Sequence, residues 1–148
     1  MLLIVPHKDG TFDHKRPVTS IEHLLADFQQ GVKEDDLTHL QEILELHDLS
    51  RDPGAGTFAA FKARSEQNIQ NRCLHHHVFD STLVVRVADH IGLKVLAVEA
   101  LLPMHIILVA RKLRPGEIAE NSRFLDSVTE FLRFSPFETD RSKGNLVH

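Results

Sequence analysis

The stretch that decides the fold lies in the C-terminal half, where residues 81–112 read "STLVVRVADHIGLKVLAVEALLPMHIILVARK". Its first part predicts an amphipathic helix, capped by Asp80 or Ser81 and ended by Gly92. The apolar positions of this helix are Leu83, Val84, Val87, Ala88 and Ile91. Two β-rich runs follow, separated only by "LPM". Because so short a connection joins only antiparallel neighbours, we predict a hairpin with strands near 94–101 and 105–111.

A further strand is predicted at the N-terminus, where Leu2 to Val5 form a continuous apolar run closed by Pro6. Such a run is typical of a strand buried on both faces, as in a parallel sheet. The chain begins inside this run, so we expect an N-terminal part of the domain to be missing. The run is too short for a signal peptide or a membrane span.

The segment from about residue 19 to 71 predicts three helices and no strand, and therefore a helical insertion. The first helix has Thr19 and Glu22 at capping-box spacing and Gly31 as its end. Its expected apolar face carries Ile21, Leu24, Leu25 and Phe28.

The second helix of the insertion is capped by Asp35 or Asp36 and runs through "LTHLQEILELHDL". His39 and His47 are eight residues apart on it and fall near one side, which we interpret as a solvated acidic face rather than a pH-sensitive one. The third helix is expected from Phe58 to Asn71, with Phe58, Phe61 and Ile69 as anchors.

After the hairpin, residues 113–148 predict an amphipathic helix from about Glu117 to Arg133 and a loose polar tail from Ser135. We assign 1–112 to one domain with its insertion and leave 113–148 as a separate C-terminal part.

Composition limits the class of protein and its partners. The 148 residues suffice for one domain, and the net charge of −4 argues against nucleic-acid binding. Cys73 is the single cysteine, so a disulfide framework is excluded and a reducing cytoplasm is predicted. We therefore predict a cytoplasmic protein with no nucleic-acid or membrane partner.

The order of these elements resembles the C-terminal portion of a class I S-adenosylmethionine-dependent methyltransferase. "LLIVP" resembles the fifth strand of that family, "HHHVFDSTL" the lead-in to its last helix, and "ILVARK" its last strand. "VPHKDGTFDHKRPVTSIEHLL" also resembles a bacterial subgroup in which helices enlarge the loop after the fifth strand. The resemblance covers residues 1–112.

The resemblance implies an α/β fold: a partial Rossmann-like sheet whose last strand is antiparallel and inserted between the other two. It implies a parent enzyme that transfers a methyl group from S-adenosylmethionine to an unidentified acceptor. The family holds this cofactor in its first half, on a Gly-rich turn and an acidic residue. "DPGAG" at 52–56 imitates such a turn, but polar "LHDLSR" precedes it instead of a buried strand. We therefore expect the isolated chain to be inactive and to bind no S-adenosylmethionine tightly, and we assign no cofactor-binding residue.

The candidate site residues follow from the resemblance and from position. Ligands of open α/β sheets lie beyond the carboxyl ends of the parallel strands. This position makes His75 and His77 candidate catalytic bases for the acceptor. The candidate substrate-binding residues are His7, Lys8, Arg16, His76 and Phe79. The two cations would suit a small anionic or glycan-like acceptor.

The three consecutive histidines, called here the histidine run (His75, His76 and His77), leave other readings open. Alternation along an extended chain would place His75 and His77 on one face and His76 on the other. The run therefore predicts no metal site by itself, and the helical zinc motif His-Glu-x-x-His is absent. One alternative function is a non-catalytic truncated module that binds a protein partner, or a second copy, through an exposed sheet edge. A His-rich metal-binding protein is the third reading.

Overall fold

The computed structural model describes residues 1–126 and 129–144, and the chain divides into two compact units. The first, called here the sheet unit, comprises residues 1–10 and 79–148. The second, the helical unit, comprises residues 11–78. The predicted insertion at 19–71 thus lies within a unit of its own, and residues 113–148 belong to the same unit as the sheet.

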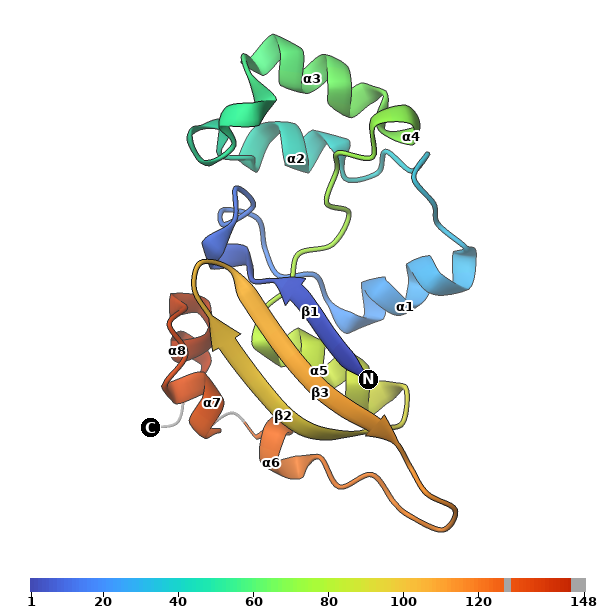
Figure 1. The fold of residues 1–148 in the computed structure, drawn as a ribbon. Helices are drawn as coiled ribbons and strands as arrows, with labels where there is room; N and C mark the ends of the chain where they lie inside the picture. The colour runs from blue at the N-terminus through green and yellow to red at the C-terminus, as the bar shows by residue number, and fades with distance from the viewer. Residues whose placement is uncertain (127–128, 145–148) are drawn as a thin grey trace. The chain divides into compact units, whose positions relative to one another are not determined.

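The sheet unit contains a sheet of the strands β1 (Leu2–Pro6), β2 (Leu93–Leu101) and β3 (His105–Lys112). Their order is β1-β3-β2, with β3 antiparallel to both neighbours (Figure 1). The predicted hairpin and the insertion of the last strand between the other two are confirmed. The hairpin turn passes so close to Gly10 that a Cβ there would lie 2.2 Å from the Pro103 carbonyl oxygen.

The apolar core of the sheet unit lies between helix α5 (Ser81–His90) and one face of the sheet. The helix begins as predicted, because the Asp80 carboxylate accepts a hydrogen bond from the Leu83 amide at 2.8 Å. In Figure 1, α5 lies behind the strands. The buried apolar residues are Val84, Val85, Ala88, Val95, Val98, Ile106, Leu108 and Ala110.

The other face of the sheet is apolar but open at β1. Leu2 is 63% exposed and Ile4 is 54% exposed, and within the described residues β1 pairs only with β3. The prediction that this strand is buried on both faces is therefore wrong for the described chain. The edge of the sheet presents apolar side chains and unpaired backbone groups.

The C-terminal segment departs from the prediction of one helix at 117–133. It contains two short helices, α6 (Ser122–Leu125) and α7 (Glu130–Arg133), with residues 127–128 outside the described part. The Asn121 side chain explains why no helix crosses 121: its oxygen accepts from the Val95 amide at 2.9 Å, and its amide donates to the Leu93 carbonyl at 2.8 Å.

The tail expected to be loose from Ser135 instead forms helix α8 (Glu138–Gly144) and is pinned by a buried carboxylate. Asp140 is fully buried and accepts hydrogen bonds from the hydroxyls of Ser81 at 2.6 Å and Ser135 at 2.8 Å. This anchor, which the sequence pattern did not reveal, corrects the prediction for residues 135–144. The rest of the tail, 145–148, lies outside the described residues.

The helical unit contains α1 (Ile21–Gln30), α2 (Leu40–Leu46), α3 (Phe58–Glu66) and α4 (Asn68–Asn71). Short 3-10 turns at Leu49–Arg51 and Pro53–Ala55 connect α2 to α3. The unit has a small apolar core of Ile43, Ala55, Phe61 and Leu74.

Helix α1 differs from its prediction at its start and on its apolar face. Ser20, and not Thr19, is the N-cap, because its hydroxyl accepts from the His23 amide at 3.1 Å. Thr19 instead accepts from the Val78 amide at 2.9 Å. Ile21 is the buried residue of α1, whereas Phe28 is 86% exposed. In Figure 1, α1 lies apart from the group formed by α2, α3 and α4.

The other two helices of the insertion are shorter than predicted. α2 begins at Leu40, because the Asp36 carboxylate accepts from the Thr38 amide and hydroxyl and so holds this segment in a turn. The predicted third helix is divided at Gln67 into α3 and α4. Of its expected anchors, Phe61 is buried, while Phe58 and Ile69 are exposed.

Helices long and apolar enough to cross a membrane are absent from residues 1–126 and 129–144.

Candidate functional site

The histidine run lies in an irregular segment of the helical unit, with a backbone bend at His77. His75 Nδ1 lies 2.6 Å from Asp13 Oδ2, and its ring stacks on Phe12. His76 Nε2 lies 3.2 Å from the Asn68 side-chain nitrogen. His75 and His76 therefore have different polar partners. The bend at His77 removes the regular alternation of faces that an extended strand would have.

The buried side chain of Arg16 fixes the backbone of the histidine run. This side chain is 1% exposed and donates from Nη1 to the His75 carbonyl at 2.7 Å and from Nη2 to the His76 carbonyl at 3.3 Å. Asp13 Oδ1 and Glu42 Oε1 accept the remaining bonds at 3.2 Å and 2.6 Å. The buried guanidinium thus positions the run, and the contact of Arg16 with a substrate stays a prediction.

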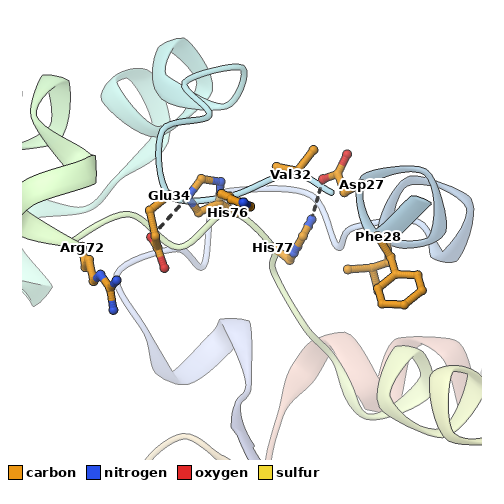
Figure 2. A pocket seen from close by; sticks show the side chains of 9 residues that line it. Asp27, Phe28, Val32, Glu34, Arg72, His76 and His77 are labelled. Carbon is orange, nitrogen blue, oxygen red and sulfur yellow. Dashed lines mark hydrogen bonds and ion pairs between the residues drawn. The ribbon is translucent and has the colours of Figure 1, made fainter. Parts of the chain in front are cut away.

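His76 and His77 line one hollow of about 570 Å³ on the helical unit, a volume within the usual range for small-molecule sites. The predicted separation of His76 from its two neighbours is wrong, because His75 instead lies against Phe12 and Asp13. The other residues of the hollow are Leu24, Asp27, Phe28, Val32, Lys33, Glu34 and Arg72. Figure 2 shows Asp27 and His77 pointing toward one another at its wall.

Beside this hollow, three imidazoles and a carboxylate converge in what is called here the four-residue cluster (His23, Asp27, His39 and His77). One ligand atom from each residue lies within 4.8 Å of the others. His23 Nε2 is 2.9 Å from His39 Nε2 and 3.2 Å from Asp27 Oδ2. His77 Nε2 is 2.8 Å from the same carboxylate oxygen.

Three different segments supply the cluster. His23 and Asp27 are four residues apart on α1 and so share one face of that helix. His39 immediately precedes α2, and His77 lies at the bend of the run. Burial lowers the pKa of the His39 imidazole, and the neighbouring His23 lowers it further. The neutral imidazole is the form that carries a free lone pair on one nitrogen.

His39 and His47 do not form the solvated helix face that was predicted, because α2 spans neither of them. His47 is 3% exposed, and its ring stacks on Phe12 and lies against Phe61, with centroids 4.3 Å away in both cases. It is a core histidine of the helical unit.

The remaining predicted residues, His7, Lys8 and Phe79, lie in the sheet unit. His7 is fully buried, stacks on Phe137 at 4.0 Å, and has Nε2 3.1 Å from Asp140 Oδ1. The contact of His7 with a substrate stays a prediction. Lys8 Nζ lies 3.9 Å from Asp9 Oδ1, and Phe79 packs partly buried against the apolar core.

Sequence reasoning missed His23 and Asp27, and it placed His39 on a solvated face. The signal that was available is the i, i+4 spacing of His23 and Asp27, which puts an imidazole and a carboxylate together on one helix. The approach of His39 and His77 carries no comparable signal, since residues 39 and 77 are far apart in the chain.

The Asp52–Gly56 loop does not suit S-adenosylmethionine. The Asp52 carboxylate, which would have to bind ribose hydroxyls, accepts from Arg64 Nη2 at 2.9 Å and contacts His47 Nε2 at 3.2 Å. The loop itself forms a 3-10 turn between two helices instead of following a buried strand. These residues therefore have a structural role within the helical unit.

Comparison of the chain with protein-family profiles, curated proteins and solved structures found no match.

Proposed function

We propose that this chain is the C-terminal portion of a class I S-adenosylmethionine-dependent methyltransferase domain, with a helical insertion after the strand β1. The observation that carries the proposal is the strand order β1-β3-β2. Both β1 and β2 run antiparallel to β3 and hence parallel to one another. The resemblance implies this arrangement, in which the fifth and sixth strands are separated by an antiparallel last strand.

The helix α5 adds to this support. It directly precedes β2 along the chain and packs on the sheet through Val84, Val85 and Ala88. A helix that leads from the region of one strand to a parallel strand and covers one face is the repeating unit of α/β sheets. The resemblance assigns the same place to the last helix of the methyltransferase domain.

S-adenosylmethionine would be held by further strands of the sheet, which would pair with the edge of β1 that faces away from β3. The exposed Leu2 and Ile4 and the open edge of β1 are the surface on which such strands would add. The resemblance assigns the cofactor site to the first half of the family's domain, so the proposed contribution of this chain is on the acceptor side. The hollow beside His76 and His77 has apolar, acidic and basic walls and is proposed to take a small acceptor or part of one.

The test compares the chain alone with a polypeptide that joins it to the segment encoded in frame upstream of Met1. The isolated chain is expected to show no low-micromolar binding of S-adenosylmethionine (about −8 kcal/mol) in calorimetry. The joined polypeptide is expected to bind it and to release S-adenosylhomocysteine when acceptors are supplied. An upstream frame without a Gly-rich turn, or a joined polypeptide without cofactor binding, would overturn the proposal.

A second candidate, a non-catalytic module that binds a partner through the β1 edge, is favoured by the same exposed Leu2 and Ile4. Both candidates predict that the isolated chain self-associates through this edge. Light scattering should then find dimers or larger species, and Leu2→Lys with Ile4→Lys should yield monomers. Ile69→Lys is the matched control, because Ile69 is 61% exposed but lies in the helical unit. Cofactor binding by the joined polypeptide distinguishes the two candidates.

A further inference from the structure

We propose that the four-residue cluster is a binding site for a divalent first-row transition ion, zinc in the first place. The ligands would be the Nε2 atoms of His23, His39 and His77 and a carboxylate oxygen of Asp27. Three imidazoles and one carboxylate form a ligand set typical of zinc. This proposal does not rest on the methyltransferase assignment, because all four residues and their contacts lie in the helical unit.

Three of the six distances between ligand atoms in the cluster are close to those of a tetrahedral shell. Zinc bonds to imidazole and carboxylate of about 2.0–2.1 Å imply ligand atoms about 3.3 Å apart. The contacts between His23 and His39, His23 and Asp27, and Asp27 and His77 measure 2.9, 3.2 and 2.8 Å. All the remaining pairs lie within 4.8 Å.

Hydrogen bonds alone satisfy this cluster poorly. An imidazole nitrogen carries either one hydrogen or one lone pair, and a carboxylate only accepts. His23 Nε2 contacts both the Asp27 oxygen and His39 Nε2, so whichever ring nitrogen carries the hydrogen, only one of these two contacts is a full hydrogen bond. A cation among the four atoms instead receives a lone pair from each imidazole and the negative charge of the carboxylate.

The surroundings hold the ligands in place without an ion. The Ser20 cap fixes the first turn of α1, where His23 lies, and the helix sets the spacing of His23 and Asp27. Arg16 binds the backbone carbonyls of His75 and His76, directly before His77. Such support of ligands by neighbouring groups is typical of metal sites in proteins.

The site would have a structural effect on α1. Among the described residues of this helix, Ile21 is the buried one, so apolar packing holds it weakly. Two of the four ligands lie on α1, and the other two lie at the start of α2 and in the histidine run. A bound ion would therefore join α1 to two segments distant in the sequence, and four protein ligands leave a tetrahedral ion closed, as in structural sites.

The test uses the full chain, freed of metal with a chelator and titrated with zinc chloride in a calorimeter. One ion per chain is expected, with a dissociation constant below about 0.1 μM, near the weak end for structural zinc sites. Loss of a group that merely supports a ligand costs about 10–100-fold in affinity. His23→Ala, His77→Ala and Asp27→Asn should therefore each weaken binding by more than about 100-fold.

His90→Ala is the matched control, because it removes an exposed histidine from the sheet unit and should leave affinity unchanged. Hydrogen exchange should show that zinc protects residues 21–30 in the natural chain and not in Asp27→Asn. Cobalt(II) should give the intense visible absorption of tetrahedral coordination, and magnesium should not compete. The proposal is overturned if the natural chain binds no stoichiometric zinc, or if a folded His23→Ala chain binds it as tightly as the natural one.

Discussion

The sheet unit buries a continuous apolar cluster between α5 and the strands β2 and β3, and its buried His7, Asp80 and Asp140 lie outside that cluster, whereas the helical unit is organised around buried charges and histidines. In the sheet unit, Val85, Ile106 and Leu108 are fully buried. In the helical unit the largest fully buried side chain is Arg16, and four apolar residues form the core.

This difference determines how the two units respond to their surroundings. Burial of apolar surface depends little on pH or on ions, whereas charged and imidazole groups change their protonation or bind metals. The helical unit is therefore the part whose stability we expect solution conditions to control. The chain contains neither Trp nor Tyr, so hydrogen exchange of peptides from residues 11–78 and 79–144 is the measurement that separates the units.

The largest effect is expected for Arg16→Met in the helical unit. The substitution leaves Asp13, which is 4% exposed, without its guanidinium partner and removes both bonds to the histidine run. Removal of one partner of a buried ion pair costs about 3–5 kcal/mol. Residues 11–78 should lose protection from hydrogen exchange by about 4 kcal/mol. Lys15→Met, next to it and half exposed, is the control and should change stability by less than about 0.5 kcal/mol. Similar losses for both variants would mean that Arg16 is not the anchor of the unit.

A somewhat smaller effect is expected for Leu108→Ala in the sheet unit. Leu108 is fully buried in the apolar core, and Leu-to-Ala changes at such sites cost about 3 kcal/mol or more. The loss should appear in residues 79–144. The exposed Leu2, which lies in the same sheet, is the matched control, and Leu2→Ala should cost less than about 0.5 kcal/mol. Equal losses for Leu108→Ala and Leu2→Ala would contradict a core on one face of the sheet.

Ser20→Ala should lower the stability of α1 by about 1 kcal/mol, because the Ser20 hydroxyl caps the helix. Without bound zinc this loss should open residues 21–30 and leave the rest of the helical unit protected. Ser20→Asp, which keeps a capping oxygen, should restore the protection. If Ser20→Ala instead destabilises the whole unit, α1 is more tightly integrated than its single buried residue indicates.

The smallest effect concerns mild acid. Burial lowers the pKa of the His47 imidazole below its ordinary value of 6.5, although the carboxylates of Asp13 and Asp52 raise it. The folded state therefore binds this proton less readily than the unfolded state, and the stability of the helical unit, complete above pH 6.5, falls as the pH decreases.

The sheet unit should respond only at lower pH. Burial raises the pKa of the Asp140 carboxyl, but hydrogen bonds from His7, Ser81 and Ser135 outweigh this and hold it below 3.8. Its contribution is complete above that value and is lost as the pH falls through the folded-state pKa. Protection factors measured from pH 7 to pH 3 should decline first in residues 11–78. His47→Phe, which keeps a ring beside Phe12 and Phe61, should reduce that early decline. An unchanged decline would assign the sensitivity to other histidines.

Part of the fold was predictable because its signals are local. The hairpin of β2 and β3 follows from two β-rich runs with a three-residue connection, and α5 follows from its apolar spacing and the Asp80 cap. The helical insertion was predictable as a region, but its helix ends were not. Thr19 and Asp36 have side chains that often cap helices. In the structure the Thr19 hydroxyl instead accepts from the Val78 amide and the Asp36 carboxylate from the Thr38 amide, and the sequence pattern does not predict these partners.

The candidate site was predictable only in fragments. The histidine run was recognisable, but its partners were not. Arg16 was expected to bind a substrate and Asp13 was not a candidate, yet both are buried against the run. The expectation of alternating faces failed because a bend at His77 interrupts the extended chain.

The sequence by itself determined the elements whose causes lie within a few residues: the hairpin, α5, the N-terminal strand and the i, i+4 pairing of His23 with Asp27. Only the tertiary structure decided that His39 and His77 meet that pair, that Asp140 anchors α8, and that Arg16 is buried. The physical reason is that these contacts join residues far apart in the chain. A buried charge or a ligand set exists only where the fold brings its partners together, and periodicity within one element does not encode that meeting.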